Sequence, residues 1–153
     1  MTGLRTRLFA LACVFVIALM LAGCGGSGSG SSGANDAAKI KQTVHQALAD
    51  LASADGQGFC SLASAAGQRK LAHTLPGYSC PRIVELISRH LPASAKTGLL
   101  HANVRDVTIK GSVATVKASD IVASQGTLKG FLEANGKPTR LVHEPDGSWK
   151  IDA

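Results

Sequence analysis

Aromatic residues are scarce in this chain of 153 residues: Phe, Trp and Tyr together make up 4% of it, with one Trp and one Tyr. Nucleobases are commonly bound by stacking on aromatic rings, so this composition disfavours a base-stacking or sugar-stacking site. Basic residues are scattered as well, with no cluster longer than Arg69-Lys70. A nucleic-acid surface requires a basic stripe or patch, and we therefore predict no nucleic-acid partner.

Several motifs of catalysis and metal binding are also missing. The chain contains no G-x-S-x-G and no C-x-x-C, and none of its histidines stand two or four residues apart: His45, His73, His90, His101 and His143. These absences remove the sequence signals of a hydrolase nucleophile elbow and of a histidine metal site. We predict neither a metal nor a cofactor.

The first 23 residues have the pattern of a secretory signal peptide. Arg5 and Arg7 precede fifteen consecutive apolar residues, 8–22. A helix that spans a bilayer needs about 20 apolar residues, whereas a signal peptide needs about 7 to 15. We therefore predict a signal peptide over 1–23, with an uncleaved membrane anchor as the alternative. The rest of the chain has 14 basic and 10 acidic residues, which predicts a mild attraction to anionic membranes.

A cysteine follows this apolar segment directly. Leu21-Ala22-Gly23-Cys24 resembles the lipobox of bacterial prolipoproteins at each of its four positions. The resemblance implies that a diacylglyceryl group is attached to the Cys24 sulfur, that the signal peptide is cut before Cys24, and that the new amino terminus is acylated. Two or three acyl chains anchor a protein stably, whereas one binds marginally. We therefore expect a lipid anchor on the extracytoplasmic face of the cell membrane; a chance cysteine is the alternative.

Glycine and serine alone make up the next nine residues, 25–33. Such a stretch has no apolar side chains to bury and is a flexible coil, with a maximum reach of about 30 Å. We predict a linker over 24–34, which begins with the lipidated cysteine, and a single folded domain over 35–153.

Two cysteines remain in the predicted domain, Cys60 and Cys80, because Cys13 lies in the signal peptide and Cys24 carries the lipid. An even pair of cysteines in an oxidising compartment predicts a disulfide. Closing a loop of about 20 residues stabilises a fold by about 3 kcal/mol. A metal pair or a redox couple is the alternative, with less support because two isolated cysteines make a poor zinc site.

The first half of the predicted domain has the periodicity of helices. An apolar stripe indicates a helix from a cap at Asn35 or Asp36 to about Ala54, and its members are Ile40, Val44, Ala47, Leu48 and Leu51. Three further helices are expected: a short one around 59–62, one that Ser64 caps and that ends before Pro76-Gly77, and one over 80–91 that Pro92 stops.

From residue 102 onward the apolar residues alternate, which is typical of β-strands. The expected strands cover 103–111, 112–119, 127–134, 139–144 and 148–152, with turns at Lys110-Gly111, 135–138 and 145–147. Residues 119–126 carry no clear pattern. Helices followed by a meander predict an α+β domain whose helices pack on one face of an antiparallel sheet.

Three stretches carry a family resemblance: the first helix leading into ADGQGFCSLAS (54–64), then GYSCPRIVELI (77–87), and EPDGSWKIDA (144–153). Together they resemble the nuclear transport factor 2-like superfamily, which includes ketosteroid isomerases, over about residues 36–153. Small lipid-anchored actinobacterial proteins of this type look similar. The resemblance implies a cone-like sheet that curves around the long helix and leaves a cavity, while function varies among members.

Strand residues would wall such a cavity, and the predicted lining is Leu128, Leu132, Leu141, His143 and Trp149. His143 shares a strand face with Leu141. Trp149 alternates with Ile151 in the last strand, so it either packs in the core or lines the cavity.

Groups for acid–base catalysis are few. A site like that of ketosteroid isomerase needs an acidic base and phenol or carboxylic-acid donors. Asp106 and Asp120 lie nearest the strands but are more typical of an edge and a turn, and Tyr78 falls in a loop, so we assign no catalytic residue. We expect a non-catalytic binding or accessory module for a small apolar ligand or an envelope protein. An isomerase-like or cyclase-like enzyme and a structural protein with a filled cone are the alternatives.

Overall fold

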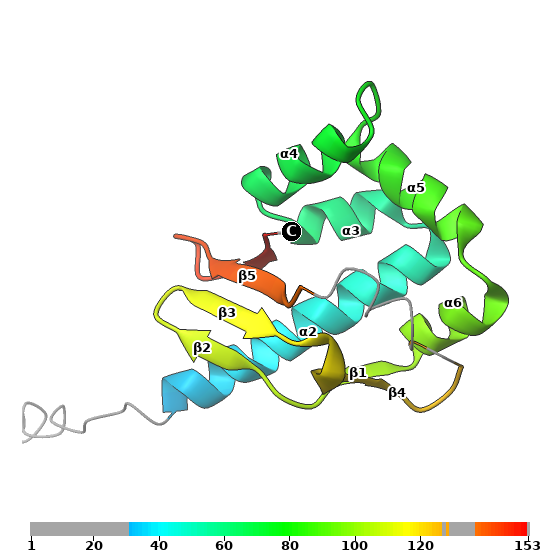
Figure 1. Ribbon diagram of the computed structural model, residues 1–153. Helices are drawn as coiled ribbons and strands as arrows, with labels where there is room; N and C mark the ends of the chain where they lie inside the picture. Colours follow the sequence, from blue (N-terminus) through cyan, green and yellow to red (C-terminus); the bar gives the residue numbers. More distant parts are fainter. Residues whose placement is uncertain (1–30, 127, 129–136, 153) are drawn as a thin grey trace, which may run out of the picture. The chain divides into compact units, whose positions relative to one another are not determined.

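The computed structural model describes residues 31–126, 128 and 137–152 (Figure 1). The predicted signal peptide, Cys24, the linker up to residue 30 and Leu132 lie outside the described residues. The chain divides into two compact units, 1–32 and 33–153. The second unit is an α+β fold, as predicted, in which the described residues form helices and two antiparallel sheets.

The first described helix, α2, runs from Ser31 to Ser53. It begins four residues before the predicted cap at Asn35, so residues 31–34 of the predicted linker are helical rather than coil. Four residues of its apolar stripe are buried, as predicted: Ile40, Val44, Ala47 and Leu51. The helix ends before Ala54, whose φ of +62° is the left-handed conformation that often follows a helix.

Three helices follow at the predicted positions: α3 (Gly56–Leu62), α4 (Ala65–Thr74) and α5 (Cys80–His90). Side-chain caps explain where the first two begin. Asp55 accepts a hydrogen bond from the Gly58 N–H at 2.8 Å, and the Ser64 hydroxyl accepts one from the Gly67 N–H at 2.9 Å. The helix α5 has a proline in its first turn, where no backbone donor is lost.

Cys60 on α3 and Cys80 at the start of α5 lie at disulfide-bonding distance, as predicted. Their Cα atoms are 6.2 Å apart, which is within the range of protein disulfides. Both cysteines are buried and belong to the hydrophobic core. The bridge therefore ties α3 to α5.

Two elements were not predicted: α6 (Ala93–Leu100) and β4 (Ile121–Ala123). The strand β4 pairs with β1 (Ala102–Val104) in a separate two-stranded antiparallel sheet. The helix α6 lacks a side-chain cap and buries the small residues Ala95 and Gly98 beside Leu99, so its sequence has little amphipathic signal.

The predicted strand 103–111 is divided: residues 105–107 separate β1 from β2 (Thr108–Lys110). The second sheet has four antiparallel strands in the order β2-β3-β5-β6, with β3 at Val113–Val116, β5 at Thr139–His143 and β6 at Trp149–Ile151. The predicted turns at Gly111 and Gly147 are confirmed, and both glycines have positive φ. A short 3-10 helix, Ala118–Asp120, follows β3. The predicted strand 127–134 lies outside the described residues, apart from Leu128.

The hydrophobic core lies between α2 and the four-stranded sheet, and Figure 1 shows α2 passing behind β2, β3 and β5. Ile40 and Val44 of α2 are buried together with Ala114, Val116 and Leu141 of the sheet. The core cluster and both bridged cysteines belong to residues 33–153, the larger of the two compact units. In the described part of the chain, no helix is long and apolar enough to cross a membrane.

Candidate apolar pocket

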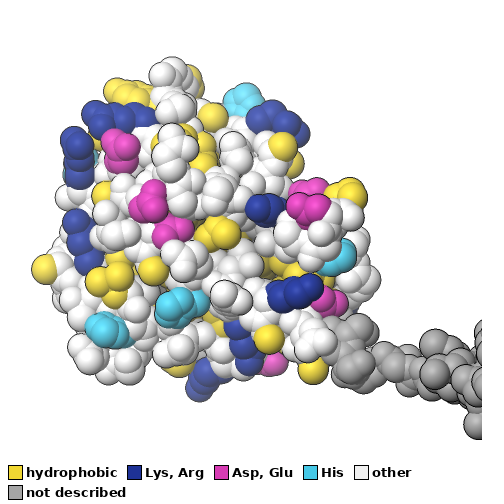
Figure 2. Space-filling model, turned by 180° about the vertical axis from the view of Figure 1, so that it is seen from behind, with side chains coloured by type: hydrophobic (Ala, Val, Ile, Leu, Met, Phe, Trp, Pro, Cys, Tyr) yellow, Lys and Arg dark blue, Asp and Glu magenta, His cyan; other side chains and the backbone are white. Residues whose placement is uncertain are grey.

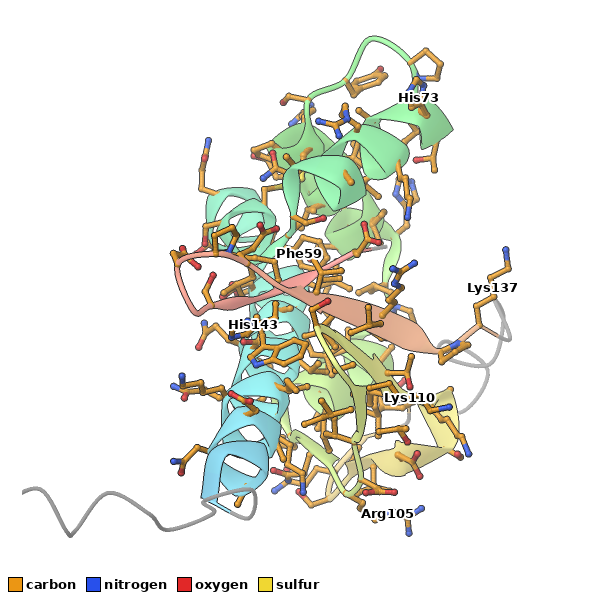
Figure 3. All side chains as sticks on the ribbon, turned by 90° about the vertical axis from the view of Figure 1, so that its left-hand side faces the viewer. Phe59, His73, Arg105, Lys110, Lys137 and His143 are labelled. Carbon is orange, nitrogen blue, oxygen red and sulfur yellow. A yellow bond between two sulfur atoms is a disulfide. The ribbon has the colours of Figure 1, made fainter. Side chains whose placement is uncertain are left out.

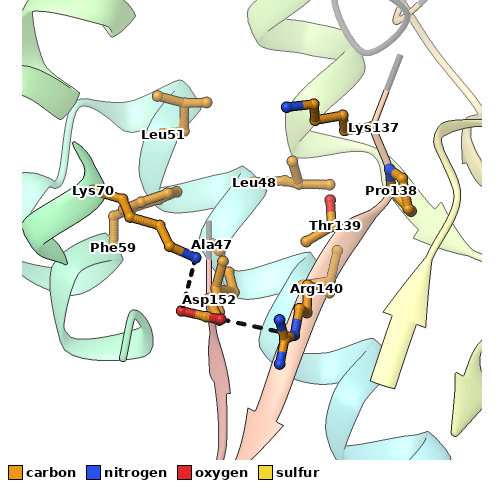
Figure 4. Close-up of a pocket in the computed structure, with 12 residues that line it drawn as sticks. Ala47, Leu48, Leu51, Phe59, Lys70, Lys137, Pro138, Thr139, Arg140 and Asp152 are labelled. Carbon is orange, nitrogen blue, oxygen red and sulfur yellow. Dashed lines mark hydrogen bonds and ion pairs between the residues drawn. The ribbon is translucent and has the colours of Figure 1, made fainter. Parts of the chain in front are cut away.

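A pocket of about 630 Å³ lies where α2, α3 and α4 meet the ends of β5 and β6. This volume is within the range of sites that bind small molecules. Its lining consists of Val44, Ala47, Leu48, Leu51, Phe59, Lys70, Lys137, Pro138, Thr139, Arg140, Ile151 and Asp152. Figure 4 shows these side chains, with apolar ones from α2 and α3 beside the charged Lys70, Lys137, Arg140 and Asp152.

The apolar part of the lining continues the stripe of α2. Leu48 and Leu51 come from the last turns of this helix, Phe59 from α3 and Ile151 from β6. Leu51 and Ile151 are buried, whereas Leu48 and Phe59 are only partly buried although they pack against the core. The stripe of α2 thus begins against the sheet and reaches, at its end, a space that no described side chain fills.

An ion-paired group of three residues forms part of the rim. The Asp152 carboxylate lies 3.4 Å from the Lys70 ammonium and 3.8 Å from Nε of Arg140, as the dashed lines in Figure 4 mark. Arg140 of β5 and Asp152 lie side by side because β5 pairs with β6, and the Asp152 N–H donates to the Arg140 carbonyl at 2.8 Å. The Ser64 hydroxyl, which caps α4, lies 3.3 Å from the same carboxylate.

The two cations of this group are exposed and the carboxylate is not. The side chains of Lys70 and Arg140 are 56% and 52% exposed, whereas that of Asp152 is 10% exposed. Lys137, just before β5, adds a third exposed cation to the lining. Three positive groups and one negative group therefore surround an apolar interior.

The described residues of the predicted lining do not line this pocket. Leu128, Leu141 and Trp149 are buried, with Leu141 and Trp149 on the strands that face α2, so Trp149 packs in the core. His143 is exposed rather than turned inward, and its ring lies against Trp149 with the ring centroids 4.9 Å apart (Figure 3). Leu132 lies outside the described residues. Inward-facing strand residues fill the core here, and the pocket opens at the strand ends.

The histidines and the groups considered for acid–base catalysis, Asp106, Asp120 and Tyr78, lie away from the pocket. All five histidines are exposed and none lines it. Asp106 is exposed and accepts a hydrogen bond from the Val107 N–H, Asp120 ends the 3-10 helix, and Tyr78 is exposed in the loop between α4 and α5. In the described part of the chain, no group of three or more His, Cys, Asp or Glu side chains is placed to hold a metal ion.

One buried carboxylate lies outside the pocket. Asp50 on α2 is 5% exposed and accepts a hydrogen bond from Gln46 at 2.7 Å, but its second oxygen has no hydrogen-bond partner among the described residues. That oxygen faces Gly58, where a Cβ atom would approach it to 2.8 Å. The neighbouring Asp55 carboxylate is already engaged as the cap of α3. This arrangement explains why residue 58 is glycine.

The surface of the domain carries both signs of charge. On the face seen in Figure 2, Lys and Arg side chains are interspersed with Asp and Glu, and small apolar areas lie between them. This face therefore has mixed charge rather than a patch of one sign.

Comparison with known proteins gives no further assignment: no family model, no curated protein and no solved structure matches this chain.

Proposed function

We propose that this protein is a lipid-anchored extracytoplasmic binding module that holds a small apolar ligand in the pocket between α2, α3, α4 and the ends of β5 and β6. The observation that carries the proposal is a cavity of about 630 Å³ whose interior is formed by Val44, Leu48, Leu51, Phe59 and Ile151. Partly exposed Leu48 and Phe59 gain favourable free energy when an apolar ligand removes them from water, at about 25 cal/mol per Å².

The sequence supports the anchoring part of the proposal. A short apolar segment, 8–22, precedes the lipobox-like Leu21-Ala22-Gly23-Cys24, and glycine and serine follow over 25–33. Acyl chains on Cys24 would hold the folded domain close to the membrane surface, and the linker would let it turn.

The lining supports binding over catalysis. The one carboxylate in the described part of the lining, Asp152, lies between the cations Lys70 and Arg140, and none of the five histidines, all of which are described, lines the pocket. An isomerase-type reaction needs an acid or base within hydrogen-bond reach of the ligand, together with a donor for the developing oxyanion. Binding requires only the apolar interior and its access to solvent.

We also propose that the domain belongs to the nuclear transport factor 2-like superfamily. The order of elements supports this assignment, because a long first helix, α2, precedes shorter helices and packs against an antiparallel sheet. The pocket beside α2 agrees with the cavity that the resemblance implies.

The binding part is tested with residues 25–153 and N-phenylnaphthylamine, a neutral dye whose fluorescence rises in apolar surroundings. We expect saturable binding that Leu48→Trp abolishes, because the larger ring occupies the pocket. The matched control, His45→Trp, places the same ring on the exposed face of α2 and leaves binding unchanged. Absence of saturable binding, or equal effects of both variants, would contradict the proposal.

The anchoring part is tested by growing cells with an alkyne analogue of palmitate. We expect the full chain to become labelled, and Cys24→Ala to remove the label. The matched control is Cys13→Ala, which lies within the predicted signal peptide and leaves the label in place. Labelling that persists in Cys24→Ala would exclude this cysteine as the anchor.

A further inference from the structure

We infer that the ligand of this pocket is a single-chain amphiphile with an anionic head group, a carboxylate or a phosphate monoester. This inference rests on the proposed binding function and adds the chemical class of the ligand. It is based on the charged residues of the rim, because a purely apolar ligand would use only the apolar interior.

The rim is positively charged on several sides of the opening. Lys70 comes from α4, and Lys137 and Arg140 come from the beginning of β5 (Figure 4). Among the described lining residues Asp152 is the single carboxylate, so in this part of the mouth positive groups outnumber negative ones. Positive charge around a low-dielectric cavity attracts anions and repels cationic ligands.

The contacts of Asp152 leave these cations partly unsatisfied. Its distances of 3.4 Å to Lys70 and 3.8 Å to Arg140 exceed the 2.7 to 2.9 Å of a strong charge-assisted hydrogen bond. The contact with Arg140 is made by Nε alone, at a distance too long for a hydrogen bond. A guanidinium has five donors in a planar fork that suits a second oxyanion. An anionic head group would find in Arg140 and Lys137 the contacts that Asp152 does not supply.

The interior accommodates the apolar chain of such a molecule. Val44 and Leu51, seven residues apart on α2, mark an apolar floor about 10 Å long at 1.5 Å per residue. Phe59 and Ile151 provide the sides. A chain that lies on this floor with its head group at the rim would satisfy both parts of the lining at once.

The test compares three ligands with the same ten-carbon chain on residues 25–153: decanoate, decyl phosphate and decanol. Each displaces N-phenylnaphthylamine, and the displacement gives its affinity. We expect decanoate or decyl phosphate to bind at least about tenfold more tightly than decanol, because hydrogen bonds to charged groups contribute that much. The preference should decrease at high salt. The tighter of the two anions identifies the head group.

Two outcomes separate this inference from the proposed function. Equal affinity for decanol and both anions would overturn the anionic head group and leave the apolar binding function standing. Failure of the dye and of all three ligands to bind would overturn the proposed function itself, and the inference with it.

Substitutions at the rim give a second test, because removal of the cations and removal of the carboxylate should change anion affinity in opposite directions. Lys137→Gln combined with Arg140→Gln should weaken anion binding about tenfold and change decanol binding less than about twofold. The control Lys110→Gln, on β2 and outside the lining, should change neither. Asp152→Asn removes the competing carboxylate at nearly constant shape and should strengthen anion binding about threefold. Weaker binding of anion and decanol alike in Asp152→Asn would indicate a purely structural role and contradict the inference.

Discussion

The two walls of the pocket are held in different ways. The helical wall, α3 with α4, is crosslinked to α5 by the Cys60–Cys80 bridge, and both of its helices begin at side-chain caps. The strand wall, β5 with β6, is held by backbone pairing and joins the helical wall where Ala63 bridges Ile151 and the Ser64 N–H donates to the Ile151 carbonyl at 2.8 Å. One wall is therefore fixed covalently, and the other is fixed by packing and hydrogen bonds.

The contrast explains how an open apolar space persists beside a dense core. A crosslinked α3 keeps Phe59 in place without full burial, because the bridge limits the conformations available to this part of the chain. The strand wall depends instead on Leu141 and Ile151, which pack on α2. Each wall is therefore sensitive to a different change.

The largest effect is expected in the strand wall. Leu141 is fully buried on β5, so Leu141→Ala should lower the free energy of unfolding by about 2 to 5 kcal/mol through lost contacts and a cavity. The matched control is Leu48→Ala, which removes the same atoms from a partly exposed pocket residue and should cost about 1 kcal/mol or less. Urea denaturation measures both, and equal losses would contradict the distinction between core and pocket.

The helical wall should respond to loss of its crosslink. Replacing Cys60 and Cys80 by serine opens a loop closed over 20 residues and should lower the free energy of unfolding by about 3 kcal/mol. Urea denaturation of the native protein with a reductant present should give a loss of the same size. If the variant and the reduced protein are as stable as the oxidised one, the bridge does not fix this wall.

The junction of the two walls should show a smaller effect. Ser64 caps α4 with a hydrogen bond of 2.9 Å and lies against Asp152, so Ser64→Ala should cost about 1 kcal/mol. Ser79 occupies the same position before α5 but makes no side-chain cap. The control Ser79→Ala should therefore leave thermal unfolding nearly unchanged, and a loss equal to that of Ser64→Ala would argue against the cap.

The smallest effect concerns the turn between β5 and β6, at the far end of the strand wall. Hydrogen bonds from the side chain and then the backbone of Ser148 hold the pKa of the exposed Asp146 below its ordinary value of 3.8. A lowered pKa in the folded state means a contribution to stability that is present above 3.8 and is lost as pH falls through the lowered pKa.

An NMR titration of the Asp146 carboxyl measures this shift directly. Ser148→Ala should move the pKa back toward 3.8, because it removes the largest cause of the shift. A midpoint at or above 3.8 in the native protein would refute the turn geometry.

Elements with a local signal were predictable from the sequence. The apolar stripe of α2, the Ser64 cap of α4 and the glycine turns between β2 and β3 and between β5 and β6 all specify structure within a few residues. The pairing of Cys60 with Cys80 was predicted from their even number in a chain whose sequence predicts export. The missed elements lack such signals: α6 is short and buries small residues, and β4 has three residues and depends on pairing with β1. The run 103–111 contains a break between two sheets that alternation does not mark.

The family resemblance implied a cavity beside the long helix, but the sequence did not identify the residues that line the pocket. Alternation along a strand identifies which residues face inward, but inward residues such as Leu141 and Trp149 are the ones that meet partners and fill the core. An open space arises where partners are missing, which depends on the packing of separate segments. The rim group has the same origin, since Lys70, Arg140 and Asp152 come from three elements with no common motif.

The central claim is that a small apolar molecule binds between α2, α3 and the ends of β5 and β6. The most direct measurement is a methyl NMR titration of residues 25–153 with decanol. The account predicts saturable shifts of the Leu48, Leu51 and Ile151 methyl groups at a single affinity. No saturable shift, or shifts confined to Leu75 and Leu100, which are exposed and lie outside the pocket, would contradict it.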